Sequence, residues 1–194
     1  MIEIGSGFSS FVMLDTNERF LDRSAKLTFI DPNPERLHSR LTPADQASAE
    51  IVARRVQDFP LERFGELSAG DILFVDSSHV AKLGSDLNHI LFEIVPTLAP
   101  GVLVHFHDVF YPFEYPPDWF ADGRFWNEAY FLRAFLQFNS QFQIYAWLDY
   151  LGAFHTAELG RALPPAVRNV STLSPSDIAP SGSLWLRRTK ETNG

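Results

Sequence analysis

The sequence contains no cysteine among its 194 residues. This absence excludes disulfides, thiolate metal sites and cysteine nucleophiles together. The sequence also has no apolar run of membrane-spanning length and no signal-peptide pattern. We therefore expect a cytoplasmic protein that has no membrane partner.

Basic side chains are few and scattered along the chain. Sixteen lysines and arginines stand against 24 acidic residues, which gives a formal net charge of −8. A protein that binds the backbone of a nucleic acid needs clustered lysine and arginine. The charge pattern therefore predicts no nucleic-acid partner and favours a small-molecule substrate.

Apolar residues are plentiful enough for one folded domain. The chain is 45% hydrophobic and 21% charged, which is ordinary for a soluble globular protein. Its length fits a single domain over residues 1–194 with a sizeable core. The segment 162–181, rich in proline and serine, is predicted to be a loop.

The first ten residues predict a ligand-binding turn. A short apolar strand runs into Gly5-Ser6-Gly7, and a helix is expected directly afterwards. Gly5 and Gly7 leave no Cβ in the way of an approaching ligand, and the free N–H groups of the new helix face the same gap. Such a turn at the head of an α/β chain is typical of a nucleotide-type cofactor site, although glycine can also serve turn geometry alone.

Strand and helix patterns alternate along the next hundred residues. The apolar segments are too hydrophobic to have a face in water, so they predict a parallel sheet that is covered on both sides. The sequence predicts strands at 26–30, 51–56, 71–75 and 102–106 and helices at 35–41, 61–67 and 86–98. Further along, it predicts a helix at 127–138 and strands at 142–147 and 182–187.

Asp31 ends the second predicted strand, 25 residues or so after the glycine turn. In dinucleotide and nucleoside folds, a carboxylate at this position accepts hydrogen bonds from the ribose hydroxyls. The alternative is an Asx turn that merely terminates the strand before Pro32. The glycine turn upstream favours the ribose interpretation.

Asp76 and Asp108 end two strands that the predicted topology makes neighbours. Adjacent strands lie about 4.8 Å apart, so both carboxylates are expected in the crevice above the sheet. Two carboxylates that close repel each other unless one is protonated or a cation lies between them. Mg²⁺ accepts such oxygen ligands, with His107 as a further ligand, whereas the alternative role for both acids is to cap the following helices or contact substrate.

His79 lies three residues after Asp76 on the same predicted loop. A neutral imidazole there can take a proton from a substrate hydroxyl, because its ordinary pKa is about 6.5. The alternative is a solvated loop histidine. His105 shares a strand face with His107 but lies deeper, so we expect it to be a core residue.

The segment 111–126 is rich in proline and aromatic residues and has no clear period. One interpretation is a lid that walls a substrate pocket; the other is a packed surface loop or an oligomer contact. Arg124 is expected to pair with an acidic group of the substrate or with Glu128. The aromatic residues that would contact substrate are Tyr111, Tyr115, Trp119 and Trp126.

Taken together, these motifs resemble the class I S-adenosylmethionine-dependent methyltransferases. The resemblance is strongest to the small-molecule branch often found beside sugar- and polysaccharide-processing genes, and it extends from residue 2 to about residue 110. The matching motifs are Glu3-Ile-Gly-Ser-Gly7, Phe29-Ile-Asp31, Asp71-Ile-Leu-Phe-Val-Asp76-Ser-Ser-His79 and Leu98-Ala-Pro-Gly-Val-Leu-Val-His-Phe-His-Asp108. The segment Arg124-Phe-Trp-Asn-Glu-Ala-Tyr130 also looks like that branch.

The resemblance implies a Rossmann-like, seven-stranded α/β sheet with one antiparallel strand near the carboxyl end. It implies S-adenosylmethionine as cofactor, with the turn residues Gly5, Ser6 and Gly7 and the preceding Glu3 beside its methionine part. Asp31 would hold the ribose, and Asp58 would lie near the adenine. Related oxygen methyltransferases hold Mg²⁺ with acids at the positions of Asp76, His107 and Asp108, and their general base aligns with His79.

This chain departs from the family pattern in two places. His107 and Val109 replace oxygen-bearing side chains of some family members. Family members also have helices before the first strand, whereas this sequence opens inside that strand. The alternatives are a truncated start, a fragment, or a version that completes its pocket by association; an apolar sheet face left uncovered would favour a homodimer.

The function that these observations favour is methyl transfer to a small hydroxylated acceptor, by O-methylation, such as a sugar or natural-product intermediate. The first rival is an NAD-binding oxidoreductase, which needs a fuller Gly-x-Gly-x-x-Gly than this chain has, because Ser10 stands at the third position. The second rival is a non-catalytic binding or oligomerisation module that retains the fold.

Overall fold

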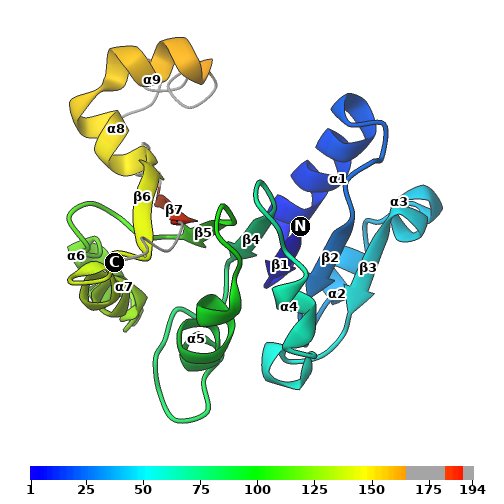
Figure 1. Ribbon diagram of the computed structural model, residues 1–194, viewed down its shortest axis with the longest axis horizontal. Coiled ribbons are helices and arrows are strands. Elements are labelled where there is room, and N and C mark those ends of the chain that lie inside the picture. Colours follow the sequence, from blue (N-terminus) through cyan, green and yellow to red (C-terminus); the bar gives the residue numbers. More distant parts are fainter. Residues whose placement is uncertain (165–181, 190–194) are drawn as a thin grey trace.

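One seven-stranded sheet organises the computed structural model, which describes residues 1–164 and 182–189. The strand order is β3-β2-β1-β4-β5-β7-β6 (Figure 1). The strands are β1 Ile2–Ile4, β2 Leu27–Ile30, β3 Ala49–Val52, β4 Ile72–Val75, β5 Leu103–His107, β6 Phe142–Trp147 and β7 Ser183–Arg188. Strands β1 to β5 pair in parallel, and β7 runs antiparallel to both β5 and β6. The predicted mostly parallel α/β sheet is confirmed.

The helices pack on both faces of this sheet. They are α1 Phe8–Phe20, α2 Glu35–His38, α3 Pro43–Ser48, α4 Glu62–Gly65, α5 Asp86–His89, α6 Pro117–Ala121, α7 Glu128–Leu136, α8 Leu148–Phe154 and α9 Thr156–Ala162. In Figure 1, α1 lies on one side of the sheet, whereas α5 and α7 lie on the other. Helices α8 and α9 project away from the body of the molecule (Figure 1).

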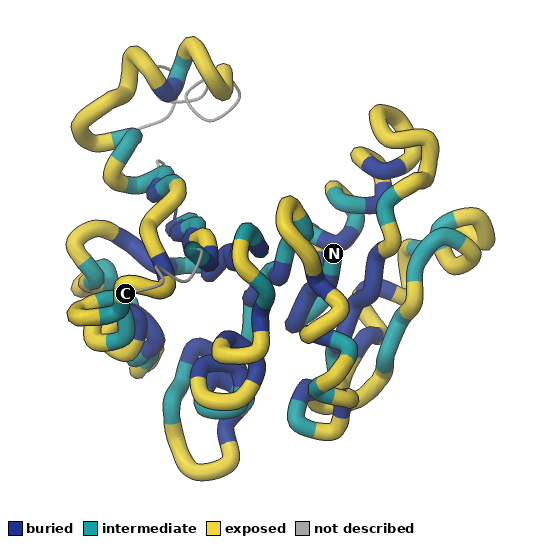
Figure 2. Tube along the Cα trace, viewed as in Figure 1, coloured by how far each residue is buried: buried dark blue, intermediate teal, exposed yellow. Residues whose placement is uncertain are grey.

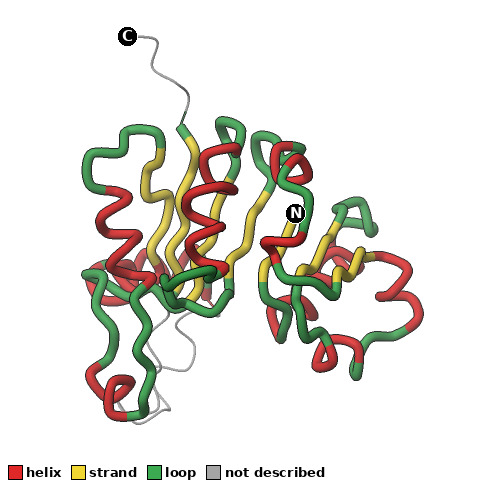
Figure 3. The backbone as a smooth tube through the Cα atoms, turned by 90° about the horizontal axis from the view of Figure 1, so that it is seen from below, coloured by secondary structure: helices red, strands yellow, loops and turns green. Residues whose placement is uncertain are grey.

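The main core lies between the sheet and the side that carries α5 and α7. Alternate residues of β4 and β5 are completely buried there, among them Leu73, Val75 and Val104. Figure 2 shows the buried positions concentrated in the strands and on the inward sides of the helices. Seen from below, helices lie over the row of strands (Figure 3). A second cluster, formed by Leu14, Leu27, Phe29 and Leu37, packs α1 and α2 against β2.

The strand order places a switch point beside β1. From β1 the chain continues outward to β2 and β3, and it then returns to the other side of β1 as β4. Connections on the two sides of such a point diverge, which opens a crevice at the carboxyl ends of the strands. The ends of β1, β2 and β4 therefore meet around one crevice.

Several boundaries differ from those that the sequence predicts. β3 begins at Ala49 and ends at Val52 rather than spanning 51–56, because its partner β2 offers only the four residues Leu27–Ile30 for pairing. Gln57 and Asp58 consequently lie in a 3₁₀ turn, Val56–Asp58, instead of ending a strand. The polar connector before β3 contains α3, whose signal is the capping box of Thr42 with Asp45 and a proline at the first helical position.

The predicted helix 86–98 is helical but not uniform. It begins as α5, widens to a π-helical stretch over Ile90–Ile94 and tightens to a 3₁₀ turn over Val95–Thr97. Pro96 lacks an N–H and cannot continue an ordinary α-helical ladder. Helices α8 and α9 are not among the elements that the sequence predicts. Of the predicted loop 162–181, residues 165–181 lie outside the described residues.

Candidate functional site

A cleft of about 720 Å³ opens at the carboxyl ends of β1, β2 and β4. Gly5 and Ser6 form part of its wall, Asp31 faces it from the end of β2, and Asp76 and His79 face it from the end of β4. This volume is in the range of cofactor pockets. The cleft is where the topology predicts a ligand, and it joins the glycine turn to the polar residues that follow β4.

Gly5 makes this wall possible because no other residue fits there. Its φ is +86°, and a Cβ would lie 1.8 Å from the carbonyl oxygen of Asp76. The turn therefore passes directly against the end of β4. Gly7 has no such constraint, does not line the cleft, and donates its N–H to Ser10 Oγ at 3.0 Å.

The Asp31 carboxylate faces the glycine turn. One oxygen, Oδ2, accepts hydrogen bonds from the backbone N–H and the hydroxyl of Ser6, both at 2.8 Å. The other, Oδ1, accepts the N–H of Asn33 at 2.8 Å. The Asx turn is thus present, and the same carboxylate also lines the cleft.

Glu3 does not line the cleft, although the sequence places it beside the glycines. It is fully buried, and its two carboxylate oxygens accept hydrogen bonds from the hydroxyls of Ser9 and Ser10, each at 2.5 Å. Burial raises the pKa of Glu3 to about 7, against the lowering effect of these two hydroxyls. Glu3 therefore ties the first turn of α1 to β1 from beneath the site.

Asp58 lies at the rim with its carboxylate directed elsewhere. It forms a two-bond pair with Arg55, at 2.8 Å to Nε and 3.0 Å to Nη2. Arg55 and Gln57 line the cleft, but Asp58 does not. Its assignment near an adenine stays a prediction. Ser77, a cleft residue that the sequence did not single out, has a buried hydroxyl oxygen without a partner among the described residues.

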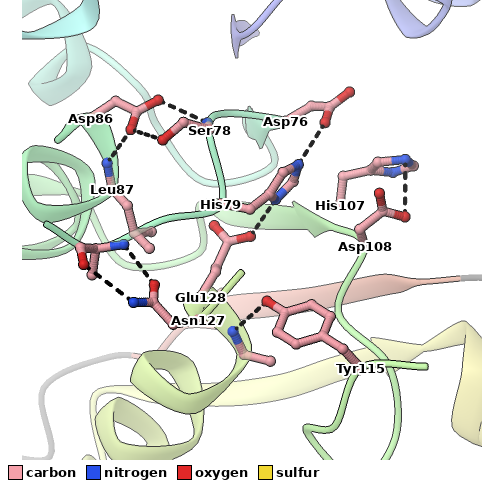
Figure 4. A network of polar contacts seen from close by, with 12 residues as sticks. Asp76, Ser78, His79, Asp86, Leu87, His107, Asp108, Tyr115, Asn127 and Glu128 are labelled. Atoms are coloured by element: carbon pink, nitrogen blue, oxygen red, sulfur yellow. Dashed lines mark hydrogen bonds and ion pairs between the residues drawn. The ribbon is translucent and has the colours of Figure 1, made fainter. Parts of the chain in front are cut away.

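Asp76, His79 and Glu128 form a chain of charges behind the cleft (Figure 4). His79 Nε2 lies 3.3 Å from Asp76 Oδ1, and Nδ1 lies 2.8 Å from Glu128 Oε2. Burial lowers the pKa of His79, but the hydrogen bonds to Asp76 and Glu128 outweigh it and raise the pKa to about 10. At neutral pH the ring is therefore a cation between two carboxylates.

This placement changes the interpretation of His79. The ring is buried, so it is not a solvated loop histidine. As a cation the ring carries a proton on both nitrogens, so it can accept a proton from a substrate only after it has lost one. Both Asp76 and His79 line the cleft, but the Asp76 side chain is 35% exposed and the His79 side chain only 6%, so Asp76 is the more accessible of the two.

Asp108 and His107 complete the polar cluster at the end of β5. His107 Nε2 lies 3.5 Å from Asp108 Oδ1. Burial raises the pKa of Asp108, while the nearby His107 and His79 lower it and the charge of Asp76 raises it further. The two strand-end acids are thus close enough to influence each other, as the sequence predicts.

The predicted Mg²⁺ ligands do not fit a magnesium ion. Mg²⁺ takes oxygen ligands in near-octahedral geometry. Here Asp76 faces His79 and Asp108 faces His107, and within residues 1–164 and 182–189 no three histidine or acidic side chains converge as a metal site would require. Histidine rings occupy the place beside each carboxylate where the sequence predicts a metal.

The aromatic loop packs over this cluster. Trp126 stacks on the His79 ring at 4.1 Å between centroids, and Trp119 meets Trp126 edge-on at 4.9 Å. Arg124 lies over Trp119 at 4.7 Å and pairs with Asp122 rather than with Glu128. Of the four predicted contact residues, Trp126 lines the cleft.

Two residues at the start of α7 hold the loop after β4, and the sequence did not single out either role. Asn127 donates to the Ala81 carbonyl at 3.2 Å and accepts from the Ala81 N–H at 2.6 Å. Glu128 is completely buried against His79. The available signal was an acid at a helix start beside tryptophan. Only the fold shows that this acid contacts His79, which lies 49 positions earlier in the chain.

Comparison with known proteins bears directly on this site. The sequence model of a family described as a methyltransferase domain matches residues 2–109, which is more than half of the chain. This match spans the glycine turn, Asp31, Asp76 and Asp108. No curated protein matches the sequence.

Solved structures with a related fold include the 16S rRNA (adenine(1408)-N(1))-methyltransferase from Catenulisporales acidiphilia and a point mutant of it. They are 12% and 13% identical to this chain, with a TM-score of 0.40 each. Each alignment covers 97% of this chain and 85% of the other.

These neighbours correct one expectation. The exclusion of nucleic acid as a partner, drawn from the net charge, is withdrawn beside these enzymes of 16S rRNA. Net charge describes the whole chain and not any one surface of it. Separately, no helix within the described ranges is long and apolar enough to span a membrane.

Proposed function

The chain belongs to the methyltransferase-domain family, and from that premise we propose that it methylates a hydroxyl oxygen of a small acceptor. It is a class I S-adenosylmethionine-dependent methyltransferase, and the family match decides against the NAD-binding alternative. One observation carries the proposal. A single cleft is lined both by the glycine turn with Asp31 and by the strand-end residues Asp76 and His79.

The residues present fit the cofactor. Asp31 would accept the ribose hydroxyls, the Gly5-Ser6 backbone would border the methionine part, and Arg55 with Gln57 would flank the adenine. The unpartnered hydroxyl of Ser77 offers one more polar contact in the same cleft. S-adenosylmethionine supplies an electrophilic methyl group on a sulfonium sulfur.

Asp76 is better placed than His79 to receive the proton of the acceptor hydroxyl. Its carboxylate reaches the cleft, whereas the His79 ring is enclosed. A hydroxyl that donates to Asp76 is oriented with its lone pairs away from the carboxylate, which aligns it for in-line attack. Burial raises the pKa of Asp76, but the hydrogen bond from His79 and the nearby histidines outweigh it and lower that pKa. Asp76 is therefore an anion and a weak base, which takes the proton late.

The aromatic loop supports a small acceptor. Trp126 closes one side of the cleft, and Tyr115 is fixed behind it because its hydroxyl accepts the Ala129 N–H at 2.9 Å. Aromatic walls exclude water and shape a pocket for a compact substrate. A sugar or a hydroxylated natural-product intermediate is the acceptor class that we propose.

The cofactor assignment predicts that Asp31→Ala binds S-adenosylhomocysteine at least about tenfold more weakly than the wild type, because two charge-assisted hydrogen bonds are lost. Calorimetric titration of both proteins measures this. The control is Asp15→Ala, an exposed acid on α1 whose ion pair with Arg19 is 3.8 Å long. Equal affinity in Asp31→Ala would remove the ribose assignment.

The acceptor is identified by transfer of a tritiated methyl group to a panel of hydroxylated sugars and phenols, with RNA as a separate arm. We expect label in a hydroxylated small molecule, in buffer that contains EDTA as well as in buffer with Mg²⁺. Label that enters only RNA, or only a nitrogen of the acceptor, would overturn the small-acceptor O-methylation proposal.

A further inference from the structure

Glu128 is a completely buried acid next to the cleft, and it touches neither the cleft nor solvent. We infer that Glu128 is a positioning residue, which acts through the His79 ring to hold the Asp76 carboxylate toward the acceptor. The inference rests on the proposed function for the identity of the acceptor, but its geometry stands on the contacts of the two side chains.

Stability alone does not account for Glu128. Its Oε1 is buried without a hydrogen-bond partner among the described residues, and only Oε2 is engaged. An enclosed carboxylate with an unpaired oxygen costs stability relative to an apolar side chain of similar volume. The fold nevertheless aims this carboxylate at one atom, the Nδ1 of His79.

The backbone fixes the same contact from a second direction. The His79 carbonyl accepts hydrogen bonds from the N–H groups of Asn127, at 3.1 Å, and Glu128, at 3.2 Å. The side chain of Asn127 clamps Ala81 two residues further along. His79 itself has a φ of +58°, a conformation that a bulky residue rarely adopts. The start of α7 and the loop after β4 therefore form one unit.

Within this unit the imidazole has little freedom to turn. Glu128 holds Nδ1, Asp76 faces Nε2, and Trp126 stacks on the ring at 4.1 Å with an interplanar angle of 26°. The two carboxylates lie at opposite ring nitrogens, so a ring held at Nδ1 presents Nε2 to Asp76. Loss of the Glu128 charge would free the ring and, with it, the direction of Asp76.

The charges around His79 all favour a cationic ring. Asp76 approaches from β4 and Glu128 from α7, while the charges of Asp108 after β5 and Asp86 on α5 act on the same group of side chains. His107 and His105 are further titratable rings close to these carboxylates. Burial raises the pKa of the Glu128 carboxyl, and the bond to His79 lowers it; we place the proton on the ring, because the ring also contacts Asp76.

The test uses Glu128→Gln, which keeps the shape and an acceptor for the Nδ1 proton but removes the charge. We expect methyl transfer to the acceptor to fall about tenfold or more in kcat, because misplacement by a fraction of an ångström has such an effect. The KM for S-adenosylmethionine and the affinity for S-adenosylhomocysteine should stay within about twofold of the wild type. If Glu128 served folding alone, the folded variant would show the wild-type kcat as well as the wild-type KM.

A spectroscopic readout covers the case in which no acceptor is found. Its wild-type spectrum also remains interpretable if the variant does not fold. Long-range ¹H–¹⁵N spectra of ¹⁵N-histidine protein at pH 7.5 report the protons on each ring nitrogen. Wild-type His79 should carry protons on both nitrogens, and Glu128→Gln should lose one of them. The matched control is Glu114→Gln, an exposed glutamate that contacts Tyr130 on α7, and it should match the wild type.

The binding measurement and the ring measurement test the proposed function and the positioning role separately. A wild-type chain that does not bind S-adenosylhomocysteine would contradict the proposed function and leave the ring measurement readable. A wild-type His79 without a proton on Nδ1 would overturn the positioning role, as would a Glu128→Gln protein with unchanged kcat and unchanged ring signals.

Discussion

Glu3 is a carboxylate that the fold removes completely from water. Among the residues that the structure describes, no cation lies beside it, and the hydroxyls of Ser9 and Ser10 are its hydrogen-bond donors. Burial therefore dominates and raises its pKa to about 7, with the charges of Asp76 and Asp31 adding to the rise. The residue joins β1 to α1 at the expense of stability near neutral pH.

This burial predicts a pH dependence of folding. The folded chain holds the Glu3 proton up to about pH 7, whereas the unfolded chain releases it near pH 4.5. The folded state binds more protons between these values, so the free energy of unfolding falls as the pH rises through this window, on the order of 3 kcal/mol from this residue. Glu3→Gln should lack that part of the decrease.

Urea unfolding of both proteins at pH 5 and pH 7.5 measures the difference, with the exposed Glu62→Gln as control. If wild type and Glu3→Gln lose the same stability between the two pH values, Glu3 does not hold a proton in the folded chain. The control should follow the wild type, because Glu62 lies in water.

His79 shows at the same scale how the fold manages neighbouring acids. The sequence places Asp76 and Asp108 close together and so calls for a cation between them. The structure supplies histidine rings, His79 beside Asp76 and His107 beside Asp108. A residue on a distant helix, Glu128, keeps the first of these rings in place.

At the scale of elements, the turn between β1 and α1 packs directly against the end of β4 at the edge of the cleft. The N–H of Gly5 donates to the Ile30 carbonyl at 2.9 Å, and the N–H of Asp76 donates to the Ile4 carbonyl at 2.9 Å. Three strands are thus joined at their carboxyl ends just where the cleft begins. A side chain on Gly5 would meet the backbone of Asp76 itself, which cannot rotate away.

Gly5→Ala should therefore lower the free energy of unfolding by more than about 3 kcal/mol, because it combines a positive φ with a backbone clash. Gly152→Ala in α8 is the matched control: its Cβ meets nothing within 4 Å, and the change should stay within about 1 kcal/mol, on the stabilising side. Denaturant unfolding compares them. Two equally stable variants would mean that the backbone of the turn can shift to accommodate a Cβ on Gly5.

At the scale of the molecule, the two halves of the chain contribute different walls of the site. The part matched by the family model, residues 2–109, supplies the wall formed by the glycine turn and Asp31 and also the strand-end acids. Trp126 and the start of α7 come from the part that follows. A ligand in the cleft contacts strand ends from the whole middle of the sheet, so its binding should stabilise the entire fold.

Saturation with S-adenosylhomocysteine should accordingly raise the melting temperature. At about 100 times its Kd, a ligand that binds only the folded state adds about 2.7 kcal/mol, which for a chain of this size is a rise of about 5–10 °C. Scanning fluorimetry measures the rise. Asp31→Ala at the same ligand concentration should show a clearly smaller one, and an unchanged wild-type melting temperature would contradict cofactor binding in the cleft.

The sequence by itself determined the sheet, the glycine turn and the strand ends on which Asp31, Asp76 and Asp108 stand. Apolar periodicity and punctuation by glycine and proline are local properties, and strand order limits where the ends of parallel strands can meet. Tertiary structure alone decided what surrounds each charge: the enclosure of Glu3, the pairing of Asp58 with Arg55, and the contact of His79 with Glu128. The physical reason is that burial and pKa depend on neighbours that the fold brings from elsewhere in the chain.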